Sequence, residues 1–217
     1  MSDRCYIRIS IPDEQDLEFI LRPYLKEWKR KVSRSDDDSD GDFYLCYEVG
    51  LDFNKVIPMP EGILKTKEYG NDDEPIRGAR LRTLNKLMKQ NLQLHGFEDW
   101  YGWSVKHWGT KWNCIPHGFE KGGAILSFST AWNPPYPIIR QLAKLVDRPV
   151  RMRYLSEPGY PEFEGLFTAF PNGDSDHLRR DEGPAGKLTT TICKVVDCPV
   201  GVFNGQLDFD QEGEASK

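Results

Sequence analysis

A tryptophan-rich stretch, Glu98 to Trp112 (EDWYGWSVKHWGTKW), constrains the fold more than any other part of the chain. It holds four of the six tryptophans, and rings of this size need a core or a partner to cover them. In one interpretation, a helix lays the rings onto a sheet and each indole N–H finds an acceptor. In the other, the rings form a partly exposed surface for a partner. The spacing predicts a helix that carries Trp100 and Trp103 on one face and ends at Gly109.

The composition is that of a globular protein with many turns. Hydrophobic residues make up 38% of the 217 residues, and the chain has 15 prolines and 19 glycines. The net charge of −5 argues against direct binding of nucleic acid, which requires a basic surface. No run approaches the ~18 apolar residues of a membrane span, and the acidic N-terminus has no apolar signal region. We therefore expect a cytoplasmic protein with no membrane partner.

Five cysteines are scattered along the chain, an odd count that suits buried free thiols in a reducing compartment. Only Cys193 and Cys198 are close in sequence, and no histidine accompanies them. This spacing is poor for zinc, so we expect no metal site there.

The pattern of apolar residues predicts short strands alternating with amphipathic helices. Helices are expected from Asp13, as N-cap, to Trp28 with a kink at Pro23, over Ala79–Leu94, and from Pro134 and Pro135 to Val146. Strands are expected over Cys5–Ile11, Phe43–Phe53, Ala124–Trp132, Val150–Ser156 and Gly165–Phe170, with β-rich segments over Lys187–Val196 and Val200–Phe209. Cys114–Gly123 is expected to be a turn region.

This order predicts a single α+β domain over 1–217. We expect a ferredoxin-like antiparallel sheet with helices packed on one face, plus N- and C-terminal β extensions. The insertions would be an acidic loop at 33–42, a polar loop at 171–186 and a C-terminal hairpin at 187–210.

Charged residues supply the candidate partner-binding positions. The acidic run near residue 40 is a solvated loop in the simplest interpretation, and a calcium loop in a sharper one that lacks the distal glutamate. Basic residues of the helix over Ala79–Leu94 form either a solvated face or a surface for phosphate or an acidic partner. The candidates for partner binding are Asp36, Asp37, Asp38, Asp40, Asp42, Asp72, Asp73, Glu74, Lys111, Arg151 and Arg153.

Catalytic signatures are missing from the sequence. It has no Walker loop, no dinucleotide-binding glycine fingerprint, no nucleophile elbow and no zincin helix. The four histidines are isolated from one another and from metal-ligand spacing. We therefore expect no catalytic residue, no cofactor and no bound metal.

Three motifs, DWYGWSVKHWGTKW, FSTAWNPP and YLSEPGYPEFEG, resemble the YubB-type ferredoxin-like family of bacterial plasmid and phage proteins. The resemblance runs from Asp99 to Gly165, and the chain differs in placing His107 where the family has Asn. It implies a ferredoxin-like domain encoded by a mobile element, and it implies no activity. The motif residues, with structural roles, are Trp100, Trp103, Trp108, Gly109, Trp112, Trp132, Pro134, Pro135, Glu157, Gly159 and Gly165.

Three functions follow as hypotheses. The first is a non-enzymatic phage or plasmid protein that binds and inhibits a host defence complex, such as a CRISPR-Cas ribonucleoprotein, with its acidic runs approaching a basic channel. The second is a single-stranded-DNA-binding or maintenance protein, with exposed rings beside basic residues. The third is a small hydrolase or nucleotide-binding enzyme that uses His107, Lys111 and Glu157.

Overall fold

The computed structural model describes residues 4–33, 43–69, 76–157, 163–182, 188–194 and 201–203, with side chains described for 4–29, 47–69, 76–157 and 163–179. Within these ranges the chain is a mixed α+β protein whose main sheet is antiparallel. The expected α+β class with an antiparallel sheet is therefore confirmed.

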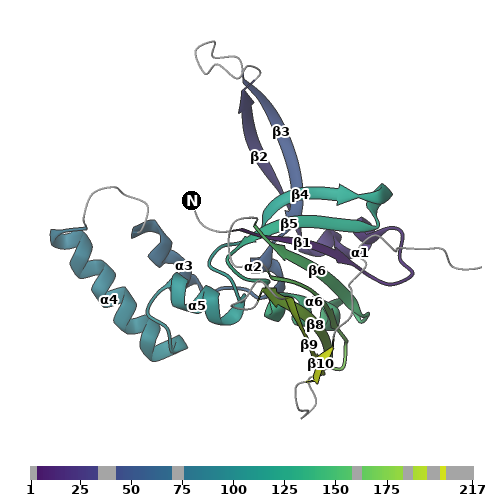
Figure 1. The fold of residues 1–217 in the computed structure, drawn as a ribbon. Helices are drawn as coiled ribbons and strands as arrows, with labels where there is room; N and C mark the ends of the chain where they lie inside the picture. The colour runs from purple at the N-terminus through teal and green to yellow at the C-terminus, as the bar shows by residue number, and fades with distance from the viewer. Residues whose placement is uncertain are drawn as a thin grey trace, which may run out of the picture.

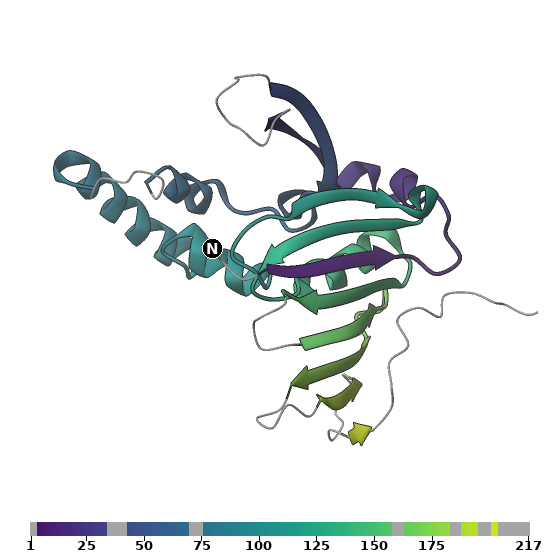
Figure 2. The same ribbon diagram turned by 45° about the horizontal axis from the view of Figure 1, so that its top comes forward.

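The main sheet has the strand order β10-β9-β8-β7-β6-β1-β5-β4 (Figures 1 and 2). Strand β1 lies between β5 and β6, although both come more than a hundred residues later in the chain. The strands are β1 (Arg4–Ser10), β4 (Ile115–Glu120), β5 (Ile125–Ala131), β6 (Val150–Ser156), β7 (Phe163–Ala169), β8 (Ser175–Glu182), β9 (Leu188–Lys194) and β10 (Gly201–Phe203).

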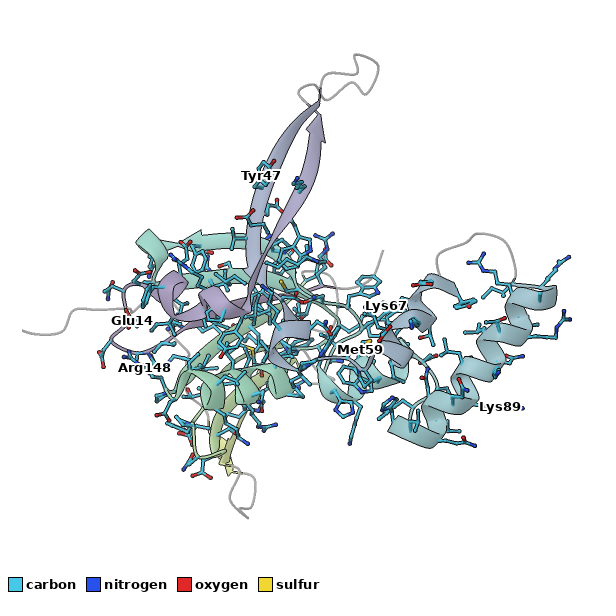
Figure 3. The ribbon with its side chains drawn as sticks, turned by 180° about the vertical axis from the view of Figure 1, so that it is seen from behind. Glu14, Tyr47, Met59, Lys67, Lys89 and Arg148 are labelled. Atoms are coloured by element: carbon cyan, nitrogen blue, oxygen red, sulfur yellow. The ribbon has the colours of Figure 1, made fainter. Side chains whose placement is uncertain are left out.

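A second, two-stranded sheet projects from the body of the molecule as a hairpin of β2 (Leu25–Ser33) and β3 (Phe43–Leu51) (Figure 1). At its base, Gly50 lies so close to β4 that an added Cβ would be 2.7 Å from Cβ of Pro116. Further along β3, Tyr47 is exposed (Figure 3). Contact with β4 thus anchors the base of the hairpin.

The prediction of a helix from Asp13 to Trp28 is wrong at both its start and its end. Its N-cap is Asp16, whose Oδ1 accepts from Phe19 N at 3.0 Å, and α1 covers only Leu17–Leu21. A 3₁₀ turn, η1 (Arg22–Tyr24), follows at Pro23, and the chain then enters β2. The reason is that proline removes the amide hydrogen bond that would continue the helix.

The other expected helices are confirmed within two residues at each end. Gly96 and Gly109, with φ of 74° and 79°, follow the ends of the longest helix and of the tryptophan-rich one. Besides α1 and η1, the helices of the described chain are α2 (Phe53–Val56), α3 (Glu61–Lys65), η3 (Thr66–Tyr69), α4 (Gly78–His95), α5 (Trp100–His107), η4 (Lys121–Gly123) and α6 (Tyr136–Val146).

The core lies between the main sheet and the helices α1, α2 and α6. On β1, the side chains of Cys5, Ile7 and Ile9 are buried while their neighbours are not. From α6, Ile139 and Leu142 are fully buried against this side. Because burial of one such side chain contributes about 1.5–3 kcal/mol, this layer holds the sheet and helices together.

Two segments expected to be loops are strands instead. The turn region expected over Cys114–Gly123 contains β4, an edge strand with a bulge between Pro116 and Gly118, which is where a sheet tolerates proline. The polar loop expected at 171–186 contains β8, which pairs with both β7 and β9. The side chains of β8 are mostly polar and show no alternation of apolar residues that would predict a strand. Its structure is determined by backbone hydrogen bonds to β7 and β9.

None of the helices in the described part of the chain is both long enough and apolar enough to cross a membrane.

Candidate binding site on the open face of the sheet

The side of β4, β5, β1, β6 and β7 that faces away from α6 carries a hollow of about 630 Å³. Figure 2 looks onto this side, with α6 behind the strands. We call it the open-face hollow, and it is lined by Tyr6, Ile7, Arg8, His117, Glu120, Ser127, Phe128, Arg153, Tyr154, Leu155 and Glu164. A volume of this size lies within the range of small-ligand and nucleotide sites.

Two exposed apolar side chains stand together in the hollow. Tyr6 on β1 and Leu155 on β6 are directly paired across the strands, and they are 38% and 48% exposed. On the other side of Tyr6, the ring of His117 is stacked on it, with centroids 6.3 Å apart and planes at 29°. Tyr6 therefore presents an aromatic ring at the centre of the open face.

Short side chains on β5 explain why the surface is hollow at this point. Ser127 and Ser129 are paired with the longer residues of β1, and Ser127 has Gly118 of β4 on its other side. Nε2 of His117 and Oγ of Ser129 are 2.5 Å apart, and the Ser127 hydroxyl donates to the Glu120 carboxylate. Because Ser129 is fully buried, its hydroxyl cannot reach a substrate carbonyl, and the His–Ser pair holds the floor of the hollow in place.

Positive charge gathers on this face although the whole chain carries −5. Arg4, Arg8, Arg151 and Arg153 occupy the positions of β1 and β6 that alternate with the buried core residues. Glu120 and Glu164 are the carboxylates that line the hollow, and Nη2 of Arg8 is 3.1 Å from Oε2 of Glu120.

The structure brings together only some of the predicted partner-binding residues. Arg151 and Arg153 share the open face, as the register of β6 against β1 requires. Lys111 lies elsewhere, with Nζ 5.7, 5.0 and 5.4 Å from the ring centroids of Tyr101, Trp112 and Trp132. The acidic candidates Asp36, Asp37, Asp38, Asp40, Asp42, Asp72, Asp73 and Glu74, and the motif residue Gly159, lie outside the described residues.

The tryptophan-rich stretch divides between the two interpretations. Trp103 and Trp108 belong to the core, and Nε1 of Trp108 donates to the Ile57 carbonyl at 2.9 Å. Trp112 is exposed at 37%, beside Lys111. The core interpretation is therefore confirmed for the middle of the stretch, while its end is exposed and a partner there stays a prediction.

The other motif residues have structural contacts. Gly109 lies against the chain that leads into α6, where an added Cβ would be 2.9 Å from Cδ of Pro137. Pro134 and Pro135 are buried in that same segment. A carboxylate oxygen of Glu157 accepts from the backbone N–H of Arg4 at 3.0 Å, which joins the end of β6 to the start of β1.

The three residues suggested for an enzyme have separate sets of contacts. His107 stacks on Trp103 with ring centroids 4.4 Å apart, and burial lowers its pKa, with a smaller effect from Lys106. Lys111 has its aromatic neighbours, and Glu157 has the backbone of Arg4. None of these contacts links two of the three residues.

A second polar cluster lies on the helix side of the sheet. Nε2 of His177 is 2.7 Å from the Tyr154 hydroxyl and 3.2 Å from the Tyr136 hydroxyl. Burial raises the pKa of Tyr136, so this phenol stays protonated and able to hydrogen-bond. The cluster ties α6 to β6 and β8.

Among the described side chains, no three His, Cys, Asp or Glu residues are grouped so that they could hold a metal ion.

Sequence reasoning missed Tyr6, Arg8, His117 and Glu120 as site residues. The signal for the first two was present, because the alternation of the first strand already places them on one face. His117 and Glu120 fall in the segment that the sequence predicts to be a turn, and a turn prediction places them on no face of the sheet. Comparison with protein-family models, with curated proteins and with solved structures found no match to this chain.

Proposed function

We propose that the chain is a binding protein that holds single-stranded nucleic acid on the open face of its sheet. The observation that carries the proposal is the exposed Tyr6 ring at the centre of the open-face hollow, with arginines on β1 and β6 around it. A base would stack on Tyr6, and Arg151 and Arg153 would contact the phosphates on either side of it.

The chemistry of these side chains suits this ligand. Aromatic rings on a sheet stack with any base, which gives affinity without strong sequence preference. Guanidinium groups bind phosphate through two parallel N–H donors, which the ammonium of lysine cannot do. The carboxylate of Glu164 at the edge of the hollow offers an acceptor for an exocyclic amine of the stacked base.

The negative net charge of the whole chain does not exclude binding of nucleic acid, because a phosphate group interacts mainly with the charges close to it. At physiological salt the screening length is about 8 Å, so charges on the far side of the protein contribute little at the open face. Arg8 and Arg153 match the carboxylates of Glu120 and Glu164 in the lining of the hollow, and Arg4 and Arg151 lie on the same face of β1 and β6 outside it. The charge near a ligand on this face is therefore less negative than the sum for the whole chain.

A ferredoxin-like topology for the core of the sheet is part of the same proposal. The chain runs β1, helices, β4, β5, α6, β6, and these four strands have the order β6-β1-β5-β4. This arrangement supports a ferredoxin-like core, with β7 to β10 and the β2–β3 hairpin as additions, and with it the proposed relationship to the YubB-type family. Such a sheet, covered by helices on one face, uses its other face in RNA-recognition domains.

Inhibition of a host defence complex stays a prediction. The two acidic runs expected to approach a basic channel lie outside the described residues. The described surface offers arginines and an aromatic ring, which favour nucleic acid over a basic protein channel.

Fluorescence anisotropy with a labelled single-stranded oligonucleotide tests the proposal at several salt concentrations. Tyr6→Leu keeps the apolar bulk and removes the ring, and we expect affinity to fall about 5- to 150-fold, the equivalent of ~1–3 kcal/mol for one stacked base. Arg153→Gln should weaken binding and reduce the slope of log affinity against log salt by ~0.7, because one phosphate contact is lost.

The matched control is Arg22→Gln, which removes the same charge from an exposed residue of η1. It should leave both affinity and salt slope unchanged. An equal effect of Arg22→Gln and Arg153→Gln, or no binding at low salt, would show that the open face is not a nucleic-acid site. Preference for duplex over single strand would also contradict the proposal.

A further inference from the structure

Helix α4 (Gly78–His95) carries leucines that the described part of the chain leaves exposed. It is 18 residues long, and Asn91 is its one buried residue. Leu81 and Leu92 are 40% and 47% exposed. In Figure 1 the helix lies at the outer edge of the molecule, away from the main sheet.

Polar contacts help to hold α4 in place, beside the half-buried side chains of Leu84 and Leu87. Nδ2 of Asn91 donates to the carbonyls of Gly62 and Glu98, at 2.9 and 3.1 Å. Nearer the N-terminus, Nη2 of Arg80 donates to the Glu68 carbonyl at 3.0 Å, and its guanidinium lies over the ring of Tyr69. The side of α4 that faces the protein is therefore the side of Asn91 and Arg80.

The exposed leucines form one ridge on a neighbouring side. Leu92 follows Leu81 by eleven residues, which is close to three full turns, and half-buried Met88 lies between them on the same line. Arg82 and Lys89 border this ridge, one residue after Leu81 and Met88. Figure 3 shows Lys89 pointing outward from α4, away from the rest of the molecule.

All charged side chains of α4 are positive. Arg80, Arg82, Lys86 and Lys89 lie within it, Arg77 precedes it, and it contains no Asp or Glu. Two copies of the protein would therefore repel each other along this helix, which argues against a dimer formed through it.

We propose that α4 docks an acidic amphipathic helix of a protein partner. The ridge of Leu81, Met88 and Leu92 would pack into the apolar seam of that helix, and Arg82 and Lys89 would pair with its carboxylates. The ridge spans ~16 Å, so it fits a partner segment of about three turns.

The same residues fit other surfaces less well. A helix that lies in a membrane interface has a broad apolar face and aromatic anchors, whereas this ridge is one residue wide and α4 contains no Trp, Tyr or Phe. Phosphates of nucleic acid would use the cations and leave the leucines in water. An acidic helix satisfies both the leucines and the charges.

NMR titration of the full chain tests this docking, with a synthetic helical peptide of about 18 residues that carries leucines in one stripe and glutamates beside it. We expect shifts confined to α4 and its neighbours. The double variant Leu81→Ser/Leu92→Ser should bind at least about tenfold more weakly, as loss of two central apolar anchors requires. A peptide with lysines in place of the glutamates should not bind.

Leu94→Ser is the matched control. Leu94 is 75% exposed, but it lies two residues beyond Leu92 and therefore on the opposite flank, so its loss should leave peptide affinity unchanged. Circular dichroism establishes that each variant folds, and oligonucleotide affinity should be unaffected in all of them. That readout separates this inference from the proposed function of the open face.

Three results would overturn the docking. The first is the absence of α4 shifts at millimolar acidic peptide. The second is equal weakening by Leu94→Ser and by the double variant. The third is binding of anionic vesicles that depends on Leu81 and Leu92 while the peptide does not bind, which would assign the ridge to a membrane surface.

Discussion

The ring of Tyr154 lies directly across Gly165, so that an added Cβ on Gly165 would overlap the Tyr154 hydroxyl and come within 2.6 Å of the Leu178 carbonyl oxygen. Gly165 is the partner of Tyr154 in the β6–β7 ladder and of Arg179 in the β7–β8 ladder. The missing side chain lets Tyr154 extend over β7 to reach His177. Glycine in the middle of this strand thus serves packing rather than a turn.

Gly165→Ala should therefore destabilise the protein although alanine suits a strand better than glycine. Either Tyr154 leaves His177 or the β7 backbone shifts, and overpacking of this kind costs about 1–3 kcal/mol. Urea denaturation measures the loss. Gly102→Ala is the control, because its Cβ would meet neighbours at an ordinary 3.6 Å within α5, and alanine is expected to stabilise a helix. Equal stability of both variants would contradict the overlap at Gly165.

The tryptophan-rich stretch offers a direct comparison of a buried and an exposed indole. Trp108 is 1% exposed and its Nε1 donates to the Ile57 carbonyl, so Trp108→Ala should cost about 3–5 kcal/mol and leave that carbonyl without its partner. Trp112→Ala removes an exposed ring over Lys111, worth about 0.5–1 kcal/mol at such a site. Denaturation midpoints of the two variants measure the difference, and similar losses would show that the stretch packs as one unit.

How far the sequence predicts this structure depends on where each element finds its partners. The helices at 78–95, 100–107 and 136–146 follow from apolar spacing and from Gly109 as terminator, which are local signals. β8 and β4 were missed because hydrogen bonds to neighbouring strands, and not their own apolar pattern, make them strands.

The open-face hollow depends on strand register, which a single sequence does not specify. Alternation alone placed Tyr6 and Arg8 on one face of β1. That Leu155 is opposite Tyr6, and Arg153 opposite Arg8, follows from the pairing of β1 with β6 across more than a hundred residues. The sequence does not predict the exposure of the α4 ridge either, because the spacing of its leucines is that of a buried helix face.

The two described buried thiols should resist alkylation in the native protein. Burial raises the pKa of Cys5 to about 12, and it raises that of Cys114 further, with the charge of Asp52 adding to the effect. At pH 8 the reactive thiolate of Cys5 would then be about one part in ten thousand, and both side chains are closed to reagent. Mass spectrometry after iodoacetamide treatment should find both cysteines modified only when urea is present. Rapid native labelling of Cys5 would contradict its burial in the core.

His107 should make the protein less stable as the pH falls below neutrality. Burial against Trp103 lowers its pKa from the ordinary value of 6.5, so below that pH the unfolded state binds the proton more readily than the folded state. The free energy of unfolding therefore rises with pH through the interval from the folded pKa to about 6.5. His107→Phe keeps a ring on Trp103 and removes the titration, so the variant should show a shallower rise between about pH 5 and pH 7 in urea denaturation. An unchanged slope, or an NMR titration that places the native pKa of His107 above 6.5, would mean that its ring is solvated rather than packed.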